Sequence, residues 1–476
     1  MSAATNARWI GAIQLAKIAV QLLSIVVLSR LLGPEDFGLV ALAAAVSTFA
    51  ILFRDLGTAP AIIQKPSLDE PTKAAAFWLN AGFGIALGLA LALIAPLIAG
   101  LMDAPRVTGL LLVLAVTFPI AGTSIVHQAL LERASRFAVV ARIEIISLVI
   151  GFAVAVIAAL AGAGPYSLVF QTVTVAVLTT IQLFVSAPWK PTEFASLDRI
   201  RDLWGFSRDM LAFNLLNYFA RNADALIIGK FLGPASLGVY SLAYKTMLFP
   251  LHNLTFVATR ALFPVMSRQQ SDVKNVASMY LRSVSVITFF TAPLMVGLFV
   301  LREPFVDAVF GASWHAVADV IAWLAPIGFI QSIVSASGTV FMALGRTKTM
   351  LRITMVSSTL HVLGFFVGVR WGITGVAACY LVTNALVAIP ILGIVSRCLH
   401  SSLSELLRAV RRPILLSLTM GLALIAARAE VSALDVPLLV QLSALTGAGV
   451  LLYFALAHFA AGALERDVFR ALLKKA

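Results

Sequence analysis

Residues 31–42 read LLGPEDFGLVAL, and residues 231–242 read FLGPASLGVYSL. Five positions of the first stretch recur in the second at a constant offset of 200: Leu32, Gly33, Pro34, Gly38 and Leu42. One Gly-Pro pair between two apolar runs predicts only a tight turn. Two copies with the same internal spacing predict an internal repeat, and hence a chain built from two related halves.

The composition around these stretches places the chain in a membrane. Its 476 residues are 60% hydrophobic and only 12% charged, with a mean hydropathy of +0.97, whereas a soluble domain carries roughly 25% charged residues. A membrane-spanning helix needs about 20 apolar residues. We therefore expect an all-α polytopic membrane protein with about fourteen spans, or twelve without the weaker last two. The predicted spans are 9–32, 37–63, 74–101, 107–131, 138–161, 164–187, 204–231, 236–266, 282–302, 317–343, 350–370, 373–396, 412–430 and 434–460.

The Lys and Arg residues of the loops predict the orientation of the spans. Twenty-four lie on one side of the predicted spans and six on the other, and basic residues in short loops are retained in the cytoplasm. Both termini are therefore predicted to be cytoplasmic, and the net charge of +13 needs no nucleic-acid partner. Six spans separate the Gly-Pro copies, so the halves share one orientation and are related by an axis near the membrane normal.

The repeat divides the chain into two six-helix lobes and a C-terminal extension. The expected parts are an N-terminal lobe at 1–190, a cytoplasmic amphipathic linker at 191–203, a C-terminal lobe at 204–400, and an interfacial helix with the last two spans at 401–476. Ser402 and Glu405 have the spacing of a capping box, which predicts that a helix begins there.

Charged side chains inside predicted spans are the first functional candidates, because charge in hydrocarbon is costly and usually faces a cavity. Five basic residues fall there: Lys17, Arg54, Arg221, Lys245 and Arg260. The offset of 200 also aligns two polar stripes, Gln14, Lys17, Gln21 and Ser24 with Asn214, Asn217, Arg221 and Asp224. Spacings of three and four residues put each stripe on one helix face, which predicts a polar cavity between the lobes. Alternatively, Arg221 and Asp224 neutralise each other within a packed bundle.

Three stretches carry a resemblance to a known family. They are LSRLLGPEDFGLVALAAAVSTFAILFRDLGTAPAIIQK at 28–65, FARNADALIIGKFLGPASLGVYSLAYKTMLFP at 219–250 and TRALFPVMSRQ at 259–269. Together they resemble the polysaccharide transporter branch, of Wzx and colanic-acid exporter type, of the multidrug/oligosaccharidyl-lipid/polysaccharide exporter superfamily. The resemblance implies the flippase fold of that superfamily, with two six-helix lobes around a cationic cavity. It also implies a bacterial inner-membrane flippase for undecaprenyl-pyrophosphate-linked oligosaccharides, serving exopolysaccharide, capsule or O-antigen synthesis.

The candidate residues take roles that fit such a substrate. Lys17 and Arg221 supply charge for the pyrophosphate, and Arg has the bidentate geometry that suits phosphate. The amides Gln14, Gln21, Asn214 and Asn217 offer hydrogen bonds to sugar hydroxyls. Arg54, Lys245 and Arg260 are further cavity cations, although Arg54 could equally bond neighbouring helices and Arg260 could snorkel to the interface. Asp224 and Asp55 are the carboxylates best placed to couple a proton or sodium ion.

No cofactor or metal site is expected. The expected partners are the lipid-linked oligosaccharide and membrane lipid, together with a polysaccharide polymerase and chain-length machinery. The three membrane histidines His127, His252 and His361 lack ligand spacing, and hydrogen bonding within the bundle is preferred to a proton relay.

Three rival functions remain at this point. A drug/cation antiporter of the same superfamily would place acidic rather than basic residues in its lobes, and a lipid II flippase shares the plan but resembles the motifs less. A membrane polysaccharide polymerase or ligase would carry a sizeable outward loop. The longest outward loop here, at about 303–316, offers only Glu303, Asp307 and His315, so transport is preferred to catalysis.

Overall fold

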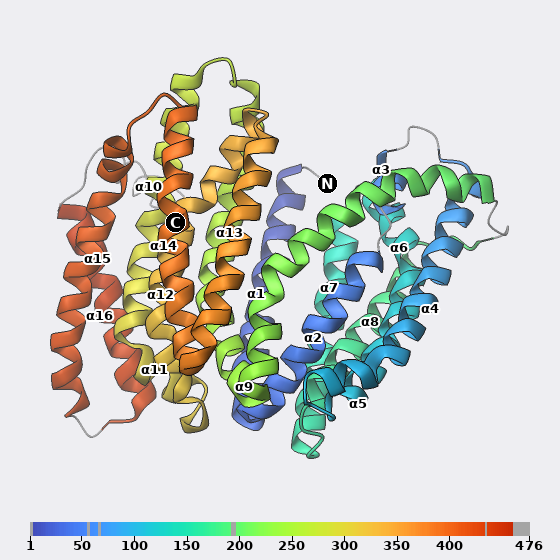
Figure 1. The fold of residues 1–476 in the computed structure, drawn as a ribbon, viewed down its shortest axis with the longest axis horizontal. Coiled ribbons are helices and arrows are strands. Elements are labelled where there is room, and N and C mark those ends of the chain that lie inside the picture. The colour runs from blue at the N-terminus through green and yellow to red at the C-terminus, as the bar shows by residue number, and fades with distance from the viewer. Residues whose placement is uncertain (1–2, 55–57, 65–67, 192–196, 434–435, 460–476) are drawn as a thin grey trace. The chain divides into compact units, whose positions relative to one another are not determined.

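The computed structural model describes residues 3–54, 58–64, 68–191, 197–433 and 436–459. Within these ranges every regular element is a helix (Figure 1). Ten helices of this part are long and apolar enough to cross a membrane, and one of the ten, Thr347–Cys398, holds two helices separated by a short 3-10 turn. The predicted all-α, multi-pass membrane class is confirmed, while the count of fourteen spans stays a prediction.

The chain forms two compact units, Met1–Gly238 and Val239–Ala476. The first unit contains α1 (Ala3–Leu31), α2 (Pro34–Arg54), α3 (Thr58–Gln64), α4 (Glu70–Leu101), α5 (Val107–Ala115), α6 (Thr117–Arg133), α7 (Phe137–Leu160), α8 (Tyr166–Ser186) and the first part of α9 (Leu197–Arg268). The second contains the rest of α9, α10 (Val273–Val300), α11 (Arg302–Val309), η1 (Ala312–Trp314), α12 (Ala316–Ala343), α13 (Thr347–Gly368), η2 (Val369–Trp371), α14 (Gly372–Cys398), α15 (Leu403–Ser432) and α16 (Leu438–Phe459). The lobes predicted at 1–190 and 204–400 stay a prediction.

Both Gly-Pro pairs interrupt a helix, as predicted. In the first copy α1 ends at Leu31 and α2 begins at Pro34, where proline's fixed φ and missing N–H suit the first helical turn. In the second copy the helix breaks at Gly233, whose φ of 81° and ψ of 172° lie in a region that favours glycine.

The second glycine of each copy serves a different purpose. A Cβ added at Gly38 would overlap the carbonyl oxygen of Pro234, and one added at Gly238 would overlap that of Pro34. All four residues belong to the first unit. The two motifs therefore cross each other reciprocally and at backbone distance, which explains why both copies have glycine at this position.

The C-terminal helices are integrated into the second unit. Leu406 and Val410 of α15 are buried in a core with Val276 of α10 and Val395 of α14. Further along, α10, α15 and α16 share a second core, in which the Tyr453 hydroxyl donates to the Phe289 carbonyl at 2.7 Å. The interfacial helix expected near 402–412 is the first part of α15, which continues to Ser432 with Pro413 inside it. Its predicted cap is present, because the Ser402 hydroxyl accepts from the Glu405 N–H at 3.3 Å.

Candidate functional site

Lys17 on α1 forms an ion pair within the first unit. Its Nζ lies 2.7 Å from Oε2 of Glu144 on α7, and the two side chains are 29% and 42% exposed. The cation is therefore accompanied by a carboxylate and remains accessible. Sequence reasoning missed Glu144, although it is the only carboxylate of α7, and an isolated charge in an apolar span is expected to have a partner.

The rest of the α1 stripe is divided between the protein interior and the surface. Ser24 is buried, and its hydroxyl accepts a hydrogen bond from Nε2 of Gln171 on α8 at 3.2 Å. Gln21 is exposed. The polar face predicted as one unit therefore contributes partly to packing inside the first unit, while Lys17 and Gln21 stay reachable.

The other predicted residues are placed unevenly by the structure. Asp224 is half-buried, and its Oδ1 accepts from the backbone N–H of Ala225 at 2.8 Å. Lys245 lies in the second part of α9 with an exposed side chain. Outside the described side chains lie Gln14, Arg54, Asp55, Asn214, Asn217, Arg221 and Arg260. The proposed joint site of Lys17 and Arg221 stays a prediction.

A polar pocket of about 230 Å³ lies within the second unit, between α12, α13 and α14. Gln331 of α12 donates from Nε2 to the Tyr380 hydroxyl at 2.9 Å and to Oδ1 of Asn384 at 3.2 Å. Asn384 in turn donates to the Tyr380 carbonyl at 2.8 Å. Ser335 and Ser357 add hydroxyls to the wall. Its polar groups are thus uncharged amides and hydroxyls together with one imidazole.

That imidazole belongs to His361, whose ring lies edge-on to Tyr380 at a centroid distance of 5.1 Å. Among the described residues its Nε2 atom is buried and has no hydrogen-bond partner. A buried polar atom left unpaired costs about 1–3 kcal/mol. The expectation of a satisfied bundle histidine is therefore wrong for His361.

The same expectation is confirmed for His127, and His252 lies outside the described side chains. The two ring nitrogens of His127 lie 3.3 Å from the Thr123 carbonyl and 3.1 Å from the Trp189 carbonyl. One feature of the sequence could have indicated the pocket around Gln331. Gln331 and Asn384 are the only amide side chains of the apolar helices α12 and α14, and isolated polar residues in membrane helices are often functional.

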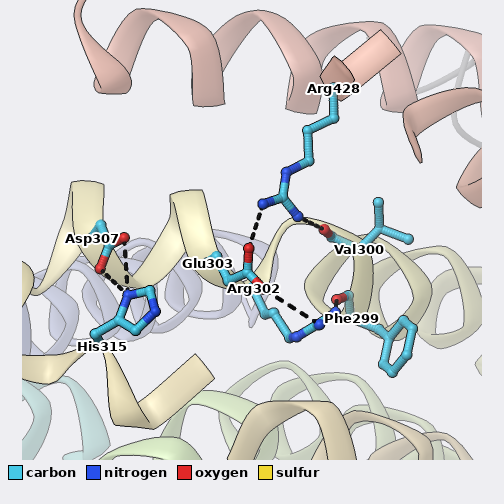
Figure 2. Close-up of polar contacts among 7 residues, drawn as sticks. All are labelled: Phe299, Val300, Arg302, Glu303, Asp307, His315 and Arg428. Carbon is cyan, nitrogen blue, oxygen red and sulfur yellow. Dashed lines mark hydrogen bonds and ion pairs between the residues drawn. The ribbon is translucent and has the colours of Figure 1, made fainter. Parts of the chain in front are cut away.

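The acidic residues of the predicted outward loop form ion pairs (Figure 2). Glu303 of α11 binds Arg428 of α15, and Arg428 also donates to the Val300 carbonyl at 3.3 Å. The hydrogen bond from Arg428 holds the pKa of the Glu303 carboxyl below its usual range. This pair ties α11 to α15 within the second unit.

His315 and Asp307 form the other pair of this region, with Nδ1 and Oδ1 3.0 Å apart (Figure 2). The hydrogen bond to Asp307 raises the pKa of His315. Both residues have a structural partner, as Glu303 does. The three groups that the outward loop offers for catalysis are therefore all engaged in ion pairs, Glu303 with Arg428 and Asp307 with His315.

The chain is similar to proteins of polysaccharide biosynthesis. A family model described as polysaccharide biosynthesis protein matches residues 27–319. The teichuronic acid biosynthesis protein TuaB of Bacillus subtilis is 25% identical over 424 residues, 88% of this chain and 87% of that protein. The succinoglycan biosynthesis transport protein ExoT of Rhizobium meliloti is 28% identical over 320 residues, 67% of this chain and 65% of that protein.

A solved structure shares the fold. The lipid II flippase MurJ, in an inward closed conformation, matches with a TM-score of 0.76 over 97% of this chain and 99% of that chain. The two sequences are 14% identical, so the likeness concerns the fold alone. It confirms the fold class predicted from the sequence.

Proposed function

The chain belongs to the polysaccharide biosynthesis protein family, and from this premise we propose that it is a flippase for a polyprenyl-pyrophosphate-linked oligosaccharide. The observation that carries the proposal is the family match over residues 27–319, which includes both Gly-Pro copies. The MurJ-like fold supports it. The protein is a transporter and not an enzyme. Two related halves of one orientation are suited to alternating access.

The chemistry of such a substrate explains the two kinds of polar group. Its isoprenoid tail remains in the bilayer, whereas the pyrophosphate and glycan need a polar path. Lys17, with Arg221 predicted on the corresponding helix, supplies positive charge for the phosphates. The uncharged pocket around Gln331 offers hydrogen bonds that suit sugar hydroxyls. Charge recognition and sugar recognition are thus assigned to different helices.

The proposed setting is the bacterial inner membrane, with both termini in the cytoplasm and the substrate released outward to a polysaccharide polymerase. Outward movement of negative charge is favoured by an inside-negative potential, by about 2.3 kcal/mol per charge per 100 mV. The potential therefore contributes to export whether or not Asp224 or Asp55 couples a proton or sodium ion.

The first test separates transport from folding. Arg221→Ala and Lys17→Ala should strongly reduce export at normal protein abundance, because a charge-assisted contact in a site of low dielectric is lost. Arg221→Lys should retain part of the activity, since charge survives without the bidentate geometry. The measurements are protein abundance in the membrane and lipid-linked oligosaccharide trapped on the cytoplasmic leaflet. Normal export by abundant alanine variants would overturn the cationic-site mechanism.

The ion pair with Glu144 allows a sharper version of this test. If Lys17 serves only to neutralise Glu144, Lys17→Met lowers abundance and Lys17→Met combined with Glu144→Gln restores both abundance and export. If Lys17 holds phosphate, the double variant is abundant but still defective. Glu144→Gln alone is the matched control and should export well, because it frees Lys17. The stability coupling of the half-exposed pair should be about 1 kcal/mol or less.

A further inference from the structure

A cluster of basic side chains lines a surface pocket that contains none of the proposed transport residues. A surface pocket of about 660 Å³ occupies the second unit, where the start of α10 meets the α14–α15 turn and the start of α15. Four basic residues line it, Lys274, Arg282, Arg408 and Arg412, together with His400. Among the described residues of the lining, Glu405 is the single carboxylate. The pocket therefore favours an anion.

Helix periodicity explains why these charges converge. Lys274 and Arg282 are two turns apart on α10, and Ser278 and Ser285 of the same face add hydroxyls. On α15, Arg408 and Arg412 are separated by four residues and so share a face. The turn between α14 and α15 is fixed by His400, with a φ of 51°, and by the Ser402 cap. The two basic faces are thus held by regular helices and a capped turn.

An apolar groove follows the same helix pair. Its volume is about 330 Å³, and it lies between α10, α12 and α15, with Ala292, Met295, Phe329, Ile414 and Leu418 among its walls. The one hydroxyl there, that of Ser417, is bonded to the Pro413 carbonyl at 2.7 Å. From Ser285 to Ala292 along α10 is about 10 Å at 1.5 Å per residue. A basic pocket and an apolar groove therefore succeed each other along α10 and α15, which pack side by side (Figure 1).

We propose that this composite surface binds an anionic membrane phospholipid, with its phosphate headgroup among the four basic residues and an acyl chain in the apolar groove. Charge complementarity selects the headgroup, because arginine forks and lysine bind phosphate oxygens. The adjoining groove selects a molecule that also has an alkyl chain. Basic pockets between membrane helices are recognised sites for anionic lipid headgroups. The bound lipid would hold α15 against α10, and it is distinct from the transported molecule.

The experiment titrates the purified full-length chain, in neutral detergent, with dioctanoyl phosphatidylglycerol and follows binding by native mass spectrometry. Phosphatidylglycerol should bind at least tenfold more tightly than dioctanoyl phosphatidylcholine. Arg282→Gln with Arg408→Gln should weaken phosphatidylglycerol binding about tenfold or more, since each basic group near an anionic lipid contributes roughly fivefold. Arg346→Gln with Arg352→Gln is the matched control, because both residues are exposed and outside the pocket, and it should change affinity less than twofold.

Further arms identify the ligand. Arg282→Lys with Arg408→Lys should retain most binding, because the positive charges are kept. This result would show that substitution at these two positions does not by itself abolish binding, so that the loss in the glutamine variant is due to the missing charge. Leu418→Gln in the groove should weaken phosphatidylglycerol binding severalfold. Equal binding of the two phospholipids, or an unchanged Arg282→Gln/Arg408→Gln variant, would overturn the proposal. So would displacement of phosphatidylglycerol by inorganic phosphate at equal concentration, which indicates a free-phosphate site, or by geranylgeranyl diphosphate at lower concentration, which indicates a site for the transported lipid.

Discussion

The polar groups of the two units differ in how they are satisfied. In the first unit Lys17 is paired with Glu144 and Ser24 with Gln171. In the second unit the pocket around Gln331 has no charged side chain in its lining, and the buried Nε2 of His361 has no partner among the described residues. A charged group inside a membrane protein usually needs a counter-charge even when no substrate is bound. A neutral polar group can remain unpaired without substrate, because the cost in stability is only about 1–3 kcal/mol. The contrast is therefore between a paired, accessible cation on α1 and a neutral pocket that contains one unpaired nitrogen.

The two Gly-Pro copies, in contrast, have the same structural role. Gly38 and Gly238 each give the backbone of the other copy room to approach. The repeat thus preserves the crossing of the helices while the polar chemistry on neighbouring helices has diverged.

The largest effect should come from filling the crossing. Gly38→Ala and Gly238→Ala each place a methyl group against a backbone carbonyl, which cannot rotate away, so each should destabilise the protein by about 3 kcal/mol or more. Gly82→Ala is the control, because nothing lies within 4 Å of its added Cβ. The measurement is the thermal unfolding temperature and the yield of folded protein in detergent. If one glycine tolerates alanine and the other does not, the crossing is not reciprocal.

Much of the fold was predictable because it follows from local patterns. Apolar runs and Gly-Pro pairs depend on neighbouring residues only, so α4, α7 and α12 begin and end within a few residues of their predicted spans. The reciprocal contact of Gly38 with the other copy was not predictable, since it depends on how two helices cross. The repeat indicated that these glycines matter, and the structure supplies the reason.

The candidate site was predictable only in part. Lys17 was found because a charge in an apolar run stands out, but its partner Glu144 lies 127 residues away and depends on the packing of α1 against α7. Gln331, His361 and Asn384 are single polar residues on three helices, and no spacing along the chain links them. Their convergence is a property of tertiary structure.

The unpaired imidazole of His361 should affect export more than stability. His361→Phe removes the unpaired nitrogen and keeps a ring of similar size, so stability should be unchanged or rise by about 1 kcal/mol. Export should nevertheless fall severalfold, because the pocket loses a group available to the substrate. His127→Phe is the contrasting control and should lose about 1 kcal/mol or more of stability, since its ring is hydrogen-bonded. Full export by His361→Phe would place the sugar site elsewhere.

The smallest effect is expected at the ion pairs of the second unit, which resemble the Lys17–Glu144 pair of the first unit in joining two charged side chains. Asp307 raises the pKa of His315 above its usual value of 6.5, and Asp319 and Glu303 act in the same direction. Because the folded state holds the His315 proton more tightly than the unfolded state, protonated His315 contributes its full stabilisation below pH 6.5. This contribution is lost as pH rises through the raised pKa. The unfolding temperature of His315→Gln should therefore be lower than that of the parent at pH 5.5 and equal to it near pH 9. Because the His315 side chain is 61% exposed, the difference should be a few tenths of a kcal/mol and should shrink at high salt.

The matched control for this pH dependence is Glu303→Gln, which breaks the pair with Arg428. The pKa of Glu303 is lowered, so its contribution is present above the ordinary carboxyl value near 4.5 and is lost only as pH falls through the lowered one. Between pH 5.5 and 9 the unfolding temperature of Glu303→Gln should therefore differ from the parent by a nearly constant amount, since Glu303 is the weakest of the groups that raise the pKa of His315. A His315→Gln difference that also stays constant over this range would mean that the imidazole acts through packing. The comparison between paired charges and an unpaired neutral group in the second unit would then depend only on the Glu303–Arg428 pair and on His361.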